Sequence, residues 1–61
     1  MYKVEKIYIY NNASYDLGYL TFDQLQKQLK GFKLFQQLDN LLIYSRKNCK
    51  YFYYVEIMAD V

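Results

Sequence analysis

Thirteen aromatic side chains, nine tyrosines and four phenylalanines, are spread over only 61 residues, and this density limits what the chain can fold into. Each buried ring removes roughly 150–250 Å² from water, so a few rings can replace a larger aliphatic core. A chain of this length forms one domain, because its core cannot be divided twice. We therefore expect a single binding domain over residues 1–61. Its surplus rings are expected at an interface, where tyrosine is favoured.

Three segments are rich in β-branched and aromatic residues, which is typical of strands. The expected strands are residues 4–10, 41–46 and 51–58. The last two form a hairpin across residues 47–50, in which Asn48 can take the left-handed conformation. Residues 11–14 are expected to form a loop and residues 39–40 a turn, because Asn, Asp and Ser side chains satisfy turn backbones.

A helix over residues 22–30 is the best-specified local element. Thr21 is a good N-cap, and Gln24 three positions later completes a capping box. Gly31 follows as the expected C-cap. A narrow apolar stripe at helical spacing consists of Phe22, Leu25 and Leu29.

Residues 32–37 fit neither the helical nor the strand period, so a short strand and an irregular segment packed on the core both stay open. The elements then run in the order β-α-(β)-β-β. A small antiparallel sheet of three or four strands, with one helix packed on one face, is the simplest way to bury them. The sequence therefore predicts an α+β fold.

The last strand is apolar on both of its sides. Its apolar residues are Tyr51, Tyr53, Val55 and Ile57 on one side, and Phe52, Tyr54 and Met58 on the other. A sheet with one face in water normally alternates apolar with polar residues. The second face should therefore be covered by residues 32–38, by a second copy of the chain or by a partner. This pattern motivates the prediction of a homodimer.

The residue types limit the chemistry. The chain has no histidine, which excludes the Ser-His-Asp triad, the Cys-His dyad and the HExxH metalloprotease helix. With one cysteine, Cys49, a zinc site of the Cys and His type is excluded too. The carboxylates show no paired spacing, and no glycine-rich phosphate loop is present. We therefore expect no catalytic residues, no metal and no cofactor.

Charge and composition suggest where the protein works. The formal net charge of +2 is too small to indicate nucleic acid by itself. A lone cysteine forms no internal disulfide, and no apolar run reaches the roughly 20 residues of a membrane helix. The first five residues alternate charged with apolar side chains, unlike a signal peptide. A soluble, cytoplasmic protein is expected, and the abundance of Lys, Asn, Tyr, Ile and Phe is typical of low-GC bacteria and their phages.

An aromatic surface edged with positive charge would be formed by Lys6, Tyr8, Tyr10, Arg46, Phe52 and Tyr54. Residues 7–11 (Ile-Tyr-Ile-Tyr-Asn) and 50–57 (Lys-Tyr-Phe-Tyr-Tyr-Val-Glu-Ile) resemble the two signature strands of the RNA recognition motif. The expected order of strand, helix, strand and strand also agrees. The resemblance implies that Tyr8, Phe52 and Tyr54 stack bases. Single-stranded nucleic-acid binding is therefore the alternative function.

Binding of another protein is the preferred function, because Tyr and Phe anchor protein contacts more often than they stack bases. The predicted partner-binding residues are Tyr8, Tyr10, Tyr44, Arg46, Phe52 and Tyr54. The specific hypothesis is a non-enzymatic inhibitor or regulator, encoded by a phage or mobile element, that occludes a surface of a host protein.

Overall fold

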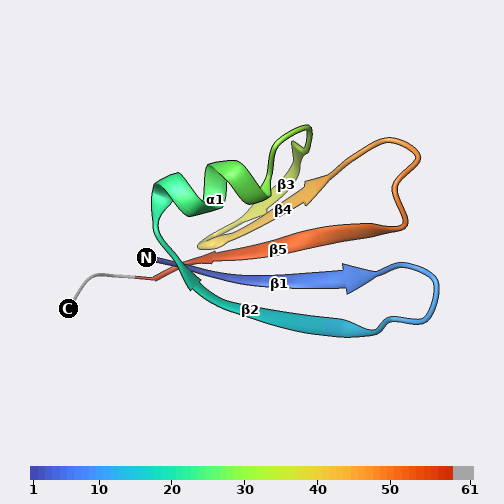
Figure 1. The fold of residues 1–61 in the computed structure, drawn as a ribbon, viewed down its shortest axis with the longest axis horizontal. Coiled ribbons are helices and arrows are strands. Elements are labelled where there is room, and N and C mark those ends of the chain that lie inside the picture. Colours follow the sequence, from blue (N-terminus) through green and yellow to red (C-terminus); the bar gives the residue numbers. More distant parts are fainter. Residues whose placement is uncertain (59–61) are drawn as a thin grey trace.

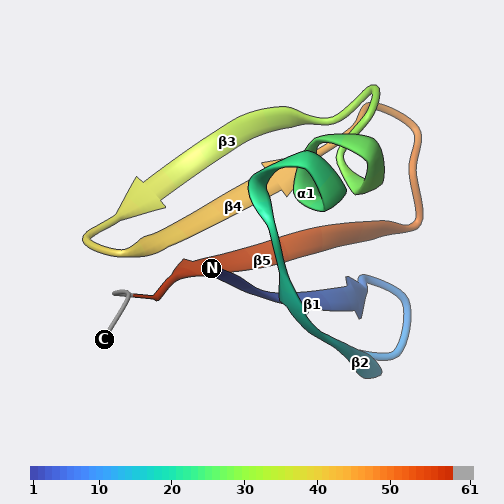
Figure 2. The same cartoon turned by 60° about the vertical axis from the view of Figure 1, so that its left-hand side comes forward.

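A computed structural model describes residues 1–58 of the chain, and its main feature is one antiparallel sheet with a short helix (Figure 1). The elements are β1 (Tyr2–Tyr8), β2 (Ser14–Leu20), α1 (Phe22–Gln28), β3 (Lys33–Leu38), β4 (Leu41–Ser45) and β5 (Tyr51–Ile57). The strand order across the sheet is β2-β1-β5-β4-β3. Helix α1 follows one edge strand, β2, crosses one face of the sheet and leads into the other edge strand, β3 (Figure 2).

The predicted fold class is wrong in its strand number and in its element order. Residues 1–58 form five strands and one helix in the order β-β-α-β-β-β, so the fold is mostly β and not the three- or four-stranded α+β arrangement. The missed strand is β2, whose sequence contains Asp16 and Gly18, two residue types that are depleted in strands. It is stabilised by pairing with β1, to which the β1–β2 hairpin ties it.

The ambiguous segment 32–37 contributes to the second edge strand. Residues Lys33–Leu38 form β3, which pairs with β4 through a tight turn in which Asp39 has a φ of 51°. The predicted turn at residues 39–40 is confirmed, and so is the left-handed conformation of Asn48, with a φ of 62°. Strand β1 starts and ends two residues before the predicted segment 4–10.

The capping box of α1 is confirmed. The Gln24 backbone N–H donates to Thr21 Oγ1 at 3.3 Å, and the Thr21 backbone N–H donates to Gln24 Oε1 at 2.9 Å. The helix ends at Gln28 with Leu29 as its C-cap, which is two residues earlier than predicted. Gly31, with a φ of 85°, lies in the turn that returns the chain to the sheet.

The core lies between α1 and one face of the sheet. The buried residues are Val4, Leu25, Leu29, Tyr53 and Val55. Val4 and Val55 face each other across β1 and β5, and both are fully buried. The Gln28 side-chain amide donates a hydrogen bond to the Tyr53 hydroxyl at 3.0 Å, which ties the helix to β5.

The opposite face of the sheet carries no buried residue among residues 1–58. Residues 32–38 do not cover it, because most of them extend the sheet sideways as β3. Phe32 packs instead on the helix side, with its ring centroid 4.9 Å from that of Tyr53. Within the described residues, one chain therefore has a covered face and an uncovered face.

The only helix described, α1, has seven residues, and no helix there is long and apolar enough to span a bilayer.

Candidate functional site

The strand register decides which side chains lie on the uncovered side, which we name the open face. Phe52 pairs with Ile7 and Tyr54 pairs with Glu5 on one flank of β5, while Tyr54 pairs with Ile43 on the other. Residues directly opposite each other in neighbouring strands point to the same side of a sheet. The open face can therefore be followed across all five strands from these pairs.

Apolar side chains gather on the half of the open face formed by β5, β4 and β3. We call this set the open-face patch, and it consists of Phe35, Leu38, Leu41, Ile43, Phe52 and Tyr54. Phe35 is 71% exposed and Leu38 is 52% exposed. The ring centroids of Phe52 and Tyr54 are 5.2 Å apart, and a shallow groove of about 350 Å³ runs between Phe35, Ile43 and these rings.

Charged side chains lie on the other half of the open face, on β1 and β2 and beside them on β5, together with Ile7 and Tyr19. Glu5 lies opposite Asp16, and Lys3 lies opposite Glu56. Three carboxylates and one ammonium group therefore flank the open-face patch on this side. A surface of this charge does not attract phosphate groups.

Both edge strands contain a β-bulge. In β2 the pairing with β1 shifts between Val4 and Glu5, where Gly18 has a φ of 79° and its N–H donates to the Asp16 carboxylate at 2.8 Å. In β3 the pairing with β4 shifts around Phe35. Bulges interrupt the regular ladder and protect sheet edges from pairing with other chains. Contact through a face is therefore favoured over strand addition at an edge.

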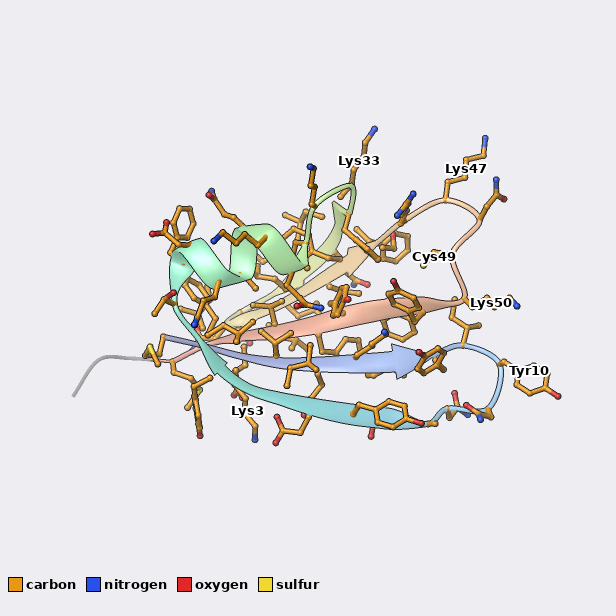
Figure 3. All side chains as sticks on the ribbon, in the orientation of Figure 1. Lys3, Tyr10, Lys33, Lys47, Cys49 and Lys50 are labelled. Carbon is orange, nitrogen blue, oxygen red and sulfur yellow. The ribbon has the colours of Figure 1, made fainter. Side chains whose placement is uncertain are left out.

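A second surface lies at the end of the sheet where the β1–β2 hairpin meets the start of β5. The Ile9 N–H donates to the Lys50 carbonyl at 2.9 Å, which holds the hairpin against the β4–β5 loop. The two segments enclose an open groove of about 610 Å³, which we call the hairpin-end groove. It is lined by Tyr8, Ile9, Tyr10, Asn11, Ala13, Tyr15, Cys49 and Lys50. Tyr10 and Lys50 extend from this end of the molecule (Figure 3).

Aromatic contacts continue from this groove along the helix side of the sheet. The Tyr8 ring packs edge-on against Tyr15 with centroids 5.7 Å apart, and it also contacts Tyr51. Lys6 Nζ lies 4.1 Å from the centroid of Tyr51. A hydrogen bond with Tyr8 raises the pKa of Lys6, and the neighbouring Tyr53 raises the pKa of Tyr51.

The structure divides the predicted partner-binding residues among three places. Phe52 and Tyr54 lie together on the open face, and Arg46 lines the groove beside them. Tyr8 and Tyr10 line the hairpin-end groove. Tyr44 packs against the core on the helix side.

The side chains that the resemblance assigns to base stacking do not share one face. Tyr8 pairs with Tyr51, so it points to the side opposite Phe52 and Tyr54. The order of elements also differs from the expected one, because two strands precede the helix. The sequence prediction missed Phe35, Leu38, Leu41 and Ile43. The two-residue period from Leu41 to Ile43 was a usable signal, whereas Phe35 lies at a bulge that no period reveals.

Comparison of the chain with protein-family models, with curated proteins and with solved structures gave no match. Function is therefore inferred from the surfaces described above. Of the nine tyrosines, only Tyr53 is buried, and Tyr10, Tyr15 and Tyr19 are exposed. The surplus of rings that the composition indicates thus lies on the surface of one chain.

Proposed function

We propose that the chain is a protein-binding module and that the open-face patch is its docking surface. The observation that supports this is the grouping of six apolar side chains on a sheet face that residues 1–58 leave uncovered. Large contiguous apolar patches on a single chain mark interaction sites. Three of the six side chains, Phe35, Phe52 and Tyr54, are aromatic, and such rings carry much of the binding energy at the centre of interfaces.

The surroundings of the patch suggest the chemistry of the partner. Glu5, Asp16 and Glu56 lie on the side of the open face next to the apolar half. Charged residues at the rim of an interface direct association and select partners more than they add affinity. A partner with an apolar centre and basic groups at its rim is complementary to this face.

Binding itself is the proposed activity. The chain has no histidine, and the described residues contain no group of three side chains suited to hold a metal ion. A domain of this kind acts by covering a surface of a larger protein, as an inhibitor or regulator. An origin in a phage or mobile element is part of the same proposal and is supported by composition alone.

A second copy of the chain is another occupant that would cover the open face. Two twisted sheets pack face to face at about 10 Å, with their apolar side chains between them. The predicted homodimer therefore remains compatible with the geometry. It is tested separately by the oligomeric state.

A matched pair of surface variants tests the docking surface. Ile43→Glu places a charge in the centre of the open-face patch, whereas Tyr19→Ala removes an exposed ring from the same face outside the patch. In affinity capture from lysate of the native host, the wild type and Tyr19→Ala should retain the same protein and Ile43→Glu should lose it. Circular dichroism establishes that both variants are folded. Equal capture by a folded Ile43→Glu variant contradicts the proposal.

A further inference from the structure

The hairpin-end groove differs from the open-face patch in both its rings and its charge. Three tyrosines line it, and two of them present large free surfaces: Tyr10 is 91% exposed and Tyr15 is 55% exposed. Tyr10 lies at the tip of the β1–β2 hairpin, where its ring extends away from the sheet (Figure 3). A free ring of this kind contributes nothing to the core, so its faces are available to a ligand.

The charge around this groove is positive. Lys50 lines it, and Lys47 precedes it in the same loop; both side chains extend from this end of the molecule (Figure 3). Lys6 adds a third ammonium group, with its Nζ 5.3 Å from the centroid of the groove residue Tyr8. None of the described residues that line the groove is acidic.

The nearest acidic side chain in sequence, Asp16, belongs to the open face. It lies opposite Glu5 in the sheet, and its carboxylate accepts the N–H of Gly18. The carboxylates thus lie on the open face, whereas lysines and free tyrosine rings surround the hairpin-end groove. A polyanion is complementary to the second surface and not to the first.

We propose that the hairpin-end groove binds single-stranded nucleic acid. Exposed aromatic rings beside a basic track are the arrangement on which unpaired bases stack while the phosphates follow the charge. Tyr10 and Tyr15 present ring faces to bases, and the three lysines Lys6, Lys47 and Lys50 contact phosphates. A groove of about 610 Å³ lies in the size range of small-ligand sites and admits part of a strand rather than a duplex.

The salt dependence follows from the number of lysines. Three phosphate contacts at about 0.7 released counterions each give a slope of about −2 in log affinity against log salt for a single strand. Affinity should then fall roughly 20-fold between 50 and 200 mM salt. Removal of one stacking ring should weaken binding about tenfold.

Fluorescence anisotropy with labelled 12-nucleotide dT and U strands tests this site. The wild type should bind with the stated salt slope, Tyr10→Ala should bind about tenfold more weakly, and Lys50→Gln should bind more weakly with a shallower slope. Tyr19→Ala is the matched control, because it removes a ring that is 56% exposed but lies outside the groove. It should leave the affinity unchanged.

Several outcomes overturn the proposal. These are no binding of either strand at 50 mM salt, binding that salt does not weaken, and binding that Tyr54→Ala abolishes while Tyr10→Ala does not. Binding of a proline-rich peptide in place of either strand would also assign the groove to a protein ligand. The capture experiment with Ile43→Glu reports on the open-face patch alone, so the two proposals fail independently.

Discussion

Shortening Val55 to alanine should remove a large part of the stability of this fold. Val55 is fully buried and faces Val4 across β1 and β5, in the only layer of core that the described residues form. The substitution deletes two methyl groups and introduces no polar atom. Its effect therefore reports on packing alone.

The size of the loss can be worked out from burial. Two buried methyl groups correspond to about 1.6 kcal/mol of transfer free energy, and the cavity left behind adds roughly 1 kcal/mol. A loss of about 2.5 kcal/mol compares with a total free energy of unfolding of roughly 3–9 kcal/mol for a chain of this length. The melting temperature should fall by roughly 10–20 °C.

Urea and thermal unfolding, followed by circular dichroism at low protein concentration, measure this loss. Leu38→Ala is the comparison, since it removes one carbon more from a side chain that is 52% exposed on the open face. It should cost only about 1 kcal/mol, because less apolar area is lost and no closed cavity forms. If both substitutions cost the same at low concentration, the core does not lie on one side of the sheet, and the reasoning about an uncovered face is refuted.

Three further predictions follow from named contacts. Thr21→Ala should lower the free energy of unfolding by about 1 kcal/mol, measured by thermal melting, because the capping bond to the Gln24 N–H is lost, whereas Thr21→Ser should retain most of it. In sedimentation at about 100 μM, where a dimer of ordinary affinity is populated, the mass of the wild type should exceed the 7.5 kDa of the monomer, and the mass of the Ile43→Glu variant should not. A monomeric wild type would contradict the predicted homodimer. The pKa values of Lys6 and Tyr51 are raised in the folded state, from 10.5 for the lysine and 10.0 for the tyrosine. The protonated forms of these two side chains therefore stabilise the fold fully below about pH 10, and this contribution is lost as the pH rises through the folded-state pKa values. Alkaline unfolding curves of Lys6→Gln and Tyr51→Phe should therefore decline less steeply above pH 10 than that of the wild type.

Features that depend on near neighbours could be predicted from the sequence. The Thr21–Gln24 capping box joins residues three positions apart, and Asn48 takes a left-handed conformation that its own side chain tolerates. The two strands β4 and β5 were expected nearly where they lie, because their β-branched and aromatic residues favour extended backbone. The rings of Phe52 and Tyr54 on the uncovered side of β5 were also expected from the alternation along the strand, although Glu56 adds a charged position to that side.

The tertiary structure decided the number of strands and the composition of the surfaces. Strand β2 exists because β1 supplies its hydrogen-bonding partner, although Asp16 and Gly18 are poor strand residues. The register then places Tyr8 opposite Tyr51 and Ile7 opposite Phe52. Side chains alternate along a strand, so a shift of one residue in that pairing would have placed Tyr8 with Phe52 on one face. Composition determined that some rings would reach the surface. The pairing of distant strands determined which rings lie on the same face, because register depends on two segments and cannot be read from either one alone.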